Sequence, residues 1–202
     1  PIAESSSTVE SSPALLVEKL NMSPTFEKKL GEALNYVNED NLYRSTRTQL
    51  VFAINNESEV KLVRYYGTSE NIDIPQRVRI DDQEYNVASI GEYAFYKKNK
   101  LKSVNLPNSI KEIAMNAFCS CNNLELIELP DSITKIDRRA FLDCKKLQLK
   151  ELPANITKIG EAAFYNCTIL QLEKLPDNIT EIGDNAFYNT NIESIYIPES
   201  VT

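Results

Sequence analysis

A 23-residue repeat decides what this chain can fold into. The dipeptide Ala-Phe recurs every 23 residues, and Leu-Pro recurs in between at the same interval. The Ala-Phe pairs begin at Ala94, Ala117, Ala140, Ala163 and Ala186, and the Leu-Pro pairs begin at Leu106, Leu129, Leu152 and Leu175. A unit of this length cannot enclose its own apolar side chains, so stacked units must bury them against their copies one turn away. We therefore expect a solenoid.

Four apolar columns run through the repeats. They begin at Val87, Ile90, Phe95 and Leu101 and recur with the same period. The column of phenylalanines is expected to be fully buried and to carry much of the stability. The strand of each unit is predicted at 101–106 (LKSVNL) and its copies, one strand per repeat in a single parallel sheet with right-handed crossovers. The return segment is predicted as short extended or 3₁₀ pieces, with tight turns near Gly91, Gly160 and Gly183.

The third and fourth predicted strands have shifted patterns. Val104 and Ile127 occupy a column that then holds Lys150 and Glu173, whereas the preceding column holds Leu126, Leu149 and Leu172. A slip of one residue exchanges the two faces of a strand. Burial of a Lys-Glu pair is costly, so we expect Leu149 and Leu172 to point inward and Lys150 and Glu173 to be exposed.

Both ends of the repeat array are irregular. Ile74-Pro75 precedes the first Leu-Pro pair by 32 residues, which places a nine-residue insertion within 77–87. Ile197-Pro198 follows the last pair at 22 residues, and Thr190 replaces the repeat cysteine. Val201 is expected to pack on Ile179 with nothing above it. We expect missing repeats or another chain to cover this C-terminal end.

The sequence ahead of the repeats predicts a cap. Residues 1–12 are Ser-rich and predicted to be a flexible lead-in, 13–73 an N-terminal cap of helices then strands, and 74–202 a solenoid of about five repeats, open at its C-terminus. Ser12-Pro13 and Ser23-Pro24 are typical helix starts, and the apolar spacing over 26–37 predicts an amphipathic helix. Segments 50–54 and 60–66 are predicted strands, joined by a turn at 55–58. The alternative is that the helix binds a partner.

Composition argues against several functions. The net charge is −7 and there is no histidine, which disfavours nucleic acid and anionic membranes and removes the usual acid/base group and metal ligand. No apolar stretch approaches the ~18 residues of a transmembrane segment. Cys121, Cys144 and Cys167 share one repeat column, with Cys119 beside it. They are predicted as buried free thiols, with a disulfide staple as the alternative. The sequence predicts no catalytic residue, no metal site and no cofactor.

The repeat pattern resembles the BspA-like (Treponema-type) leucine-rich repeats of bacterial surface proteins. The residues concerned are SIGEYAFYKKNKLKSVNLPNSI (89–110), ITKIGEAAFYNCTILQLEKLP (156–176) and ITEIGDNAFYNTNIESIYIP (179–198). The resemblance implies an α/β-type leucine-rich repeat solenoid, mostly β and irregular, with one parallel sheet and a small helical plus β-strand cap. It also implies a cell-surface or secreted location, for which a lipid-bearing leader ahead of Pro1 is one route, and a role in adhesion.

The predicted function is that of a non-enzymatic binding module. Its partner would be a protein or a glycan, for instance a host matrix protein, bound by strand positions that point away from the core. These candidate binding residues are Ser103, Asn105, Glu128, Glu151, Lys174, Ser194 and Tyr196. The alternative is a structural spacer within a larger surface protein, with no ligand of its own.

Overall fold

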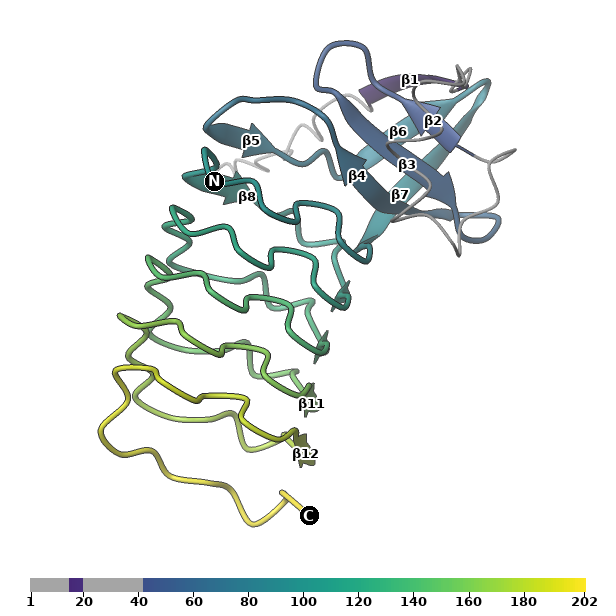
Figure 1. Ribbon diagram of the computed structural model, residues 1–202. Helices are drawn as coiled ribbons and strands as arrows, with labels where there is room; N and C mark the ends of the chain where they lie inside the picture. The colour runs from purple at the N-terminus through teal and green to yellow at the C-terminus, as the bar shows by residue number, and fades with distance from the viewer. Residues whose placement is uncertain (1–14, 20–41) are drawn as a thin grey trace, which may run out of the picture.

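The computed structural model describes residues 15–19 and 42–202. A β-barrel stands at the N-terminal side, and a stack of irregular rungs extends from it towards the C-terminus (Figure 1). The residues described contain strands and turns and no helix. The solenoid predicted from the repeats is confirmed; the handedness of its crossovers stays a prediction.

Six strands close into the barrel. Strand β7 pairs with β4, the order continues β4-β3-β2-β1-β6, and β6 pairs back onto β7. Closure leaves no free sheet edge around this end of the molecule. The strands are β1 (Leu15–Lys19), β2 (Leu42–Arg44), β3 (Leu50–Ile54), β4 (Glu59–Tyr65), β6 (Arg77–Ile80) and β7 (Gln83–Ile90).

The cap differs from its prediction at its start. Segments 50–54 and 60–66 are strands as predicted, and in the turn between them the Ser58 N–H donates to Asn56 Oδ1 (2.9 Å). A helix starting at Ser12-Pro13 is wrong, because 15–19 is β1, which pairs with β2 on one side and β6 on the other. Barrel closure outweighs the local helix-start signal. The helix predicted over 26–37 lies outside the described residues.

The nine-residue insertion has a structural role. It lies in the β6–β7 hairpin, whose antiparallel pairing runs from Arg77↔Asn86 to Ile80↔Gln83 and closes the barrel. The C-terminal end of β7 leaves β6, and Ser89 and Ile90 pair in parallel with the first rung of the solenoid. Strand β7 is thus shared by the barrel and the solenoid.

The parallel ladder of the solenoid does not use the predicted strand. It runs through the Ile90 column, in the segment expected as the return, by way of β9 (Glu112–Ile113), β10 (Lys135–Ile136), β11 (Lys158–Ile159) and β12 (Glu181–Ile182). The predicted strand appears only in the first repeat, as β8 (Ser103–Asn105), which pairs with β5 (Asn71–Asp73). The prediction of a single sheet through LKSVNL and its copies is therefore wrong.

A register slip explains why that strand does not repeat. Leu149 and Leu172 are buried, and Lys150 and Glu173 are exposed, as predicted. The slip begins one repeat earlier than expected, because Leu126 is buried and Ile127 is 65% exposed. In β8 the inward residue is Val104, whereas in the corresponding segment of the next repeat it is Leu126. The buried faces of these two segments are therefore offset by one residue.

Stacked phenylalanine rings form the centre of the core. From Phe95 to Phe187, successive ring centroids lie 5.0, 5.3, 5.5 and 5.5 Å apart with nearly parallel planes. The column is fully buried as predicted except for Phe187, which is partly buried. Tyr65 of β4 extends the stack into the barrel at 5.5 Å from Phe95. Its N–H donates to the Ala94 carbonyl, as the Phe95 N–H does to that of Ala117. One apolar core therefore runs from the barrel through the repeats.

The turns use left-handed residues other than glycine. Two positions per repeat have positive φ, one before Ala-Phe and one two residues after it, for example Asn116 (φ 56°) and Ser120 (φ 61°). The turns predicted near Gly91, Gly160 and Gly183 are present, since turn residues follow directly at 92–97, 161–166 and 184–189, but no described glycine has positive φ, so other residues supply the left-handed conformation. Glycine is needed for close approach instead: a Cβ on Gly160 would collide with the Arg138 backbone nitrogen, and one on Gly183 with that of Glu161.

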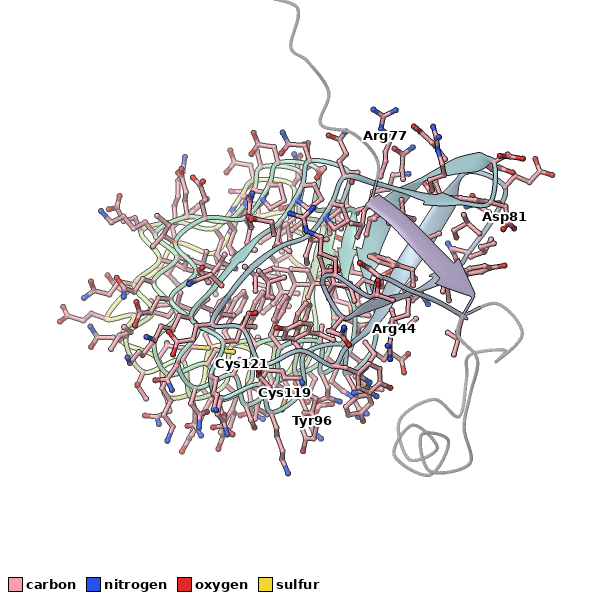
Figure 2. All side chains as sticks on the ribbon, turned by 90° about the horizontal axis from the view of Figure 1, so that it is seen from above. Arg44, Arg77, Asp81, Tyr96, Cys119 and Cys121 are labelled. Atoms are coloured by element: carbon pink, nitrogen blue, oxygen red, sulfur yellow. The ribbon has the colours of Figure 1, made fainter. Side chains whose placement is uncertain are left out.

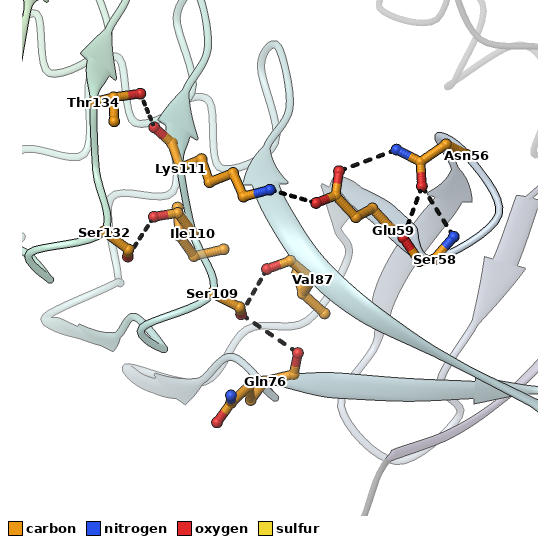
Figure 3. A network of polar contacts seen from close by, with 10 residues as sticks. All are labelled: Asn56, Ser58, Glu59, Gln76, Val87, Ser109, Ile110, Lys111, Ser132 and Thr134. Atoms are coloured by element: carbon orange, nitrogen blue, oxygen red, sulfur yellow. Dashed lines mark hydrogen bonds and ion pairs between the residues drawn. The ribbon is translucent and has the colours of Figure 1, made fainter.

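Polar contacts join the barrel to the first rungs (Figure 3). Lys111 Nζ lies 2.6 Å from Glu59 Oε1, and Asn56 Nδ2 donates to Glu59 Oε2. The hydrogen bond from Lys111 holds the pKa of Glu59 below its usual value. Ser109 donates to the Val87 carbonyl (2.8 Å) and so fixes the first Leu-Pro turn to β7.

Candidate functional site

An open groove of about 1140 Å³ crosses the repeats. It lies on the side that carries β5 and β8, the two strands labelled beside the first rungs in Figure 1. Its floor is built by the β5–β8 pair, by the segments that take the position of β8 in the later repeats and by the Leu-Pro turns. A proline ends each of these extended segments, because proline has no backbone N–H to donate to a β-ladder. The groove thus follows the repeat period.

Five of the seven predicted binding residues line this groove. They are Ser103, Asn105, Glu128, Glu151 and Lys174, and all are exposed. The other two, Ser194 and Tyr196, are exposed but do not line it. The structure therefore brings five predicted residues together, while binding by any of them stays a proposal.

Sequence reasoning missed part of the groove. Asn71 and Asp73 come from β5, ahead of the repeats, and Asp131 and Asp177 come from the Leu-Pro turns. The two turn residues lie 46 residues apart, at the same repeat position. That periodicity is visible in the sequence, whereas the pairing of β5 with β8 is not.

The groove lining is strongly acidic. Its charged residues are Lys174 and six carboxylates, namely Asp73, Glu125, Glu128, Asp131, Glu151 and Asp177. Of these carboxylates, Glu125 has a described ion-pair partner, Lys146 at 3.1 Å. The surface therefore offers anionic acceptors to a ligand.

Backbone groups add to this surface. The Leu126 carbonyl accepts from the Gln148 N–H, and the Lys150 carbonyl accepts from the Glu173 N–H. The backbone N–H groups at 126–129 and 149–152 make no hydrogen bond to another residue in the described part of the chain. Unpaired backbone of this kind is able to hydrogen-bond an extended ligand.

The cysteine column is structural. All four cysteines are free and buried. The thiols of Cys121, Cys144 and Cys167 donate to the carbonyls of Phe95, Phe118 and Phe141 at 3.0, 3.1 and 3.2 Å. Burial raises the pKa of Cys121 to about 12 and also raises that of Cys144. These thiols tie each repeat to the preceding one and do not line the groove.

Residues 15–19 and 42–202 contain no group of three or more His, Cys, Asp or Glu side chains that could hold a metal ion. Nor does this part of the chain contain a helix with the length and apolarity needed to cross a membrane.

The geometry defines a class: a capped repeat solenoid with a lateral groove. The family model described as a BspA type leucine rich repeat region matches residues 88–202 of this chain in six copies. That match covers more than half of the chain, and the chain therefore belongs to this family. A comparison with curated proteins gave no match.

Solved structures agree with this assignment. A leucine-rich repeat protein from Bacteroides ovatus is 30% identical with a TM-score of 0.68, covering 76% of this chain and 41% of its own. A leucine rich cell surface protein from Faecalibacterium prausnitzii is 28% identical with a TM-score of 0.64, covering 80% and 49%. A T. pallidum leucine-rich repeat protein is 28% identical with a TM-score of 0.67, covering 77% and 72%. The chain thus spans less than half the length of the first two.

Proposed function

We propose that this chain is a non-enzymatic recognition module of the bacterial cell surface, which binds a partner protein in the acidic groove. The single observation that carries the proposal is the gathering of five exposed predicted residues in one groove, whose charged lining consists of six carboxylates and one lysine, three of these seven being among the five. The fitting partner presents a basic, extended segment, whose cations would face the carboxylates and whose backbone would meet the unpaired N–H groups.

The comparisons support the location and the class of function. The Faecalibacterium prausnitzii protein is a cell surface protein by its description, and repeat solenoids generally use an extended face to bind other proteins. Adhesion to a host matrix protein is the form of recognition we propose for this surface.

The experiment compares the chain with a groove variant against a panel of purified matrix proteins by surface plasmon resonance. The variant Glu128→Gln/Asp131→Asn/Glu151→Gln removes three groove carboxylates that have no described ion pair. The control Glu57→Gln/Glu92→Gln/Asp184→Asn makes the same charge change at exposed positions outside the groove. We expect a panel member to bind the chain and the control alike and the groove variant at least about tenfold more weakly.

Equal loss in both variants would show a general charge effect and contradict the groove. Absence of binding across the panel would favour the second candidate, a spacer in a larger surface protein.

A further inference from the structure

Residues that directly follow a Leu-Pro or Ile-Pro pair form a row along the groove. Seen from above, the repeats lie nearly behind one another (Figure 2), so equivalent positions line up across them. Five such residues are exposed and line the groove, and we call them the turn row: Gln76, Asn108, Asp131, Ala154 and Asp177. The sixth, Glu199, does not line it. The two carboxylates of the turn row, on Asp131 and Asp177, are therefore two repeats apart, with the short side chain of Ala154 between them.

Hydrogen bonds hold the turn row at a fixed spacing. The Asp131 carbonyl accepts from Asn155 Nδ2 of the next repeat (2.9 Å). The Ala154 carbonyl likewise accepts from Asn178 Nδ2 (2.9 Å). Inside the same repeats, successive Phe rings are 5.0 to 5.5 Å apart. Adjacent turns are thus about 5 Å apart, as hydrogen-bonded segments are, and Asp131 and Asp177 about 10 Å apart.

A second charged row of the groove directs a cation towards the turn row. It consists of exposed strand positions one repeat apart, namely Asn105, Glu128, Glu151 and Lys174. Lys174 stands three residues before Asp177 in the same repeat, so it repels a ligand cation from the strand positions there. A cationic ligand that spans these repeats is therefore attracted to Asp131 and Asp177.

The spacing of these two carboxylates favours some ligand conformations over others. In a β-strand, neighbouring side chains on one face are about 6.6 Å apart, which is too short. In a polyproline II helix, side chains three residues apart share a face and are about 9.3 Å apart. In an α-helix, side chains seven residues apart share a face and are about 10.5 Å apart. The spacing therefore favours the two helices over a strand.

The groove backbone distinguishes between the two helices. In the part of the chain that the structure describes, the N–H groups at 126–129 and 149–152 make no hydrogen bond to another residue. An α-helix uses its carbonyls internally, whereas polyproline II leaves its carbonyls free to accept. Proline also brings no N–H that would need an acceptor. The exposed Ile127 in the groove offers apolar contact to a proline ring.

We propose that the groove binds a polyproline II segment with a basic residue at every third position, such as repeated Lys-Pro-Pro. This inference rests on the proposed function, because it specifies the basic, extended segment that the groove binds. Two of the cations lie at Asp131 and Asp177, and a third reaches the β5 segment, which carries Asp73. Carbonyls of the segment accept from the groove N–H groups. The segment therefore runs across the repeats and not along one strand.

The test is NMR titration of the full chain with three synthetic peptides of equal charge. The first has three lysines with two prolines between neighbours. The second has the same composition but three prolines between neighbours, so that successive lysines point in different directions. The third is an alanine-rich helical peptide with its three lysines seven residues apart. At low ionic strength we expect the first to bind at least about threefold more tightly than the others, with shifts at 126–129 and 149–152.

A variant of the chain that changes the carboxylate spacing tests the turn row. Ala154→Asp/Asp177→Ala keeps the number of groove carboxylates but places those of the turn row one repeat apart instead of two. The preference for the first peptide over the second should fall below about 1.5-fold. The control Glu92→Gln/Asp184→Asn changes exposed positions outside the groove and should keep the preference. Thermal melting of each variant shows whether it is folded.

The outcomes separate this inference from the proposed function. Equal binding of the first two peptides, equally tight binding of the helical peptide, or an unchanged preference in Ala154→Asp/Asp177→Ala would overturn the polyproline II inference. If the peptides nevertheless bound more weakly to Glu128→Gln/Asp131→Asn/Glu151→Gln than to the unmodified chain, the proposed function would stand without it. Binding of no peptide, or equal binding to that triple variant, would contradict both.

Discussion

Leu126 is buried, while Ile127, the next residue in the chain, is 65% exposed. The two side chains therefore point to opposite faces, and the buried face is offset by one residue from that of β8. This offset ends the β5–β8 sheet after two strands and leaves the unpaired segments that form the groove floor.

The first prediction tests this register. Leu126→Ala should lower the free energy of unfolding by about 2–5 kcal/mol, because it empties a core site. Ile127→Ala should change it by less than about 0.5 kcal/mol, since little burial is lost. Urea titration monitored by circular dichroism measures the free energy of unfolding of both variants. The reverse order of the two effects would mean that Ile127, and not Leu126, fills the core.

The second prediction concerns the ring stack. Phe141 has a ring on each side and is fully buried, so Phe141→Ala should cost about 3–5 kcal/mol. Phe187 is partly buried and stacks on one described ring, that of Phe164. Phe187→Ala should therefore cost clearly less in the same titration. A cost below about 1 kcal/mol at Phe141 would contradict its place in the core.

These two cases mark what the sequence could predict. The periodic columns predict which residues are inside, since a 23-residue unit buries the same position in every turn. This holds for the columns that begin at Val87, Ile90, Phe95 and Leu101, except that the last member of each is only partly buried, namely Val201, Ile182, Phe187 and Ile192. The inward orientation of the Leu149 and Leu172 side chains was also predictable, because the alternative register would have buried the Lys-Glu pair that follows them in the chain.

Backbone pairing was not predictable from side-chain pattern. The extended segment at 101–106 has the stronger strand pattern, yet the ladder runs through the two-residue strands at Ile113 and its copies. Nor did the sequence show that Tyr65 continues the Phe column, because it precedes Phe95 by 30 residues and not by 23. In the site, the repeat predicted the exposed strand positions, whereas β5 joins them through long-range pairing.

The third prediction concerns close backbone approach. A Cβ at Gly160 would meet the backbone of Arg138, which has little room to move. Gly160→Ala should therefore cost about 1–3 kcal/mol, although alanine normally stabilises a chain relative to glycine. The control is Ala114, the same repeat position two units earlier. Ala114→Gly should cost only about 0.5–1 kcal/mol in backbone entropy. A stabilising effect of Gly160→Ala in thermal melting would contradict the collision.

The fourth prediction concerns the thiols and alkaline pH. Burial raises the pKa of Cys121 from 9.0 to about 12, so the folded state keeps its proton where the unfolded state loses it. The stability that this thiol contributes is present below pH ~9 and is lost as the pH rises from there towards ~12. At one pH unit above the unfolded value, the loss is about 1 kcal/mol for this group.

Urea titrations at several pH values between 8 and 10 measure this loss, with variants to isolate the group. Cys121→Ala should be less stable at pH 8 but should lose less stability on going to pH 10 than the unmodified chain does. Cys119 is less deeply buried, and its pKa rise is limited by a contact with Ser120. Cys119→Ala should therefore keep most of the pH dependence. Identical pH dependence in the chain and in Cys121→Ala would mean that the Cys121 thiol is not held protonated by the core.

A thiol titration of the denatured, non-reduced chain tests the redox state of the same column. A count below four thiols would show that the column is oxidised.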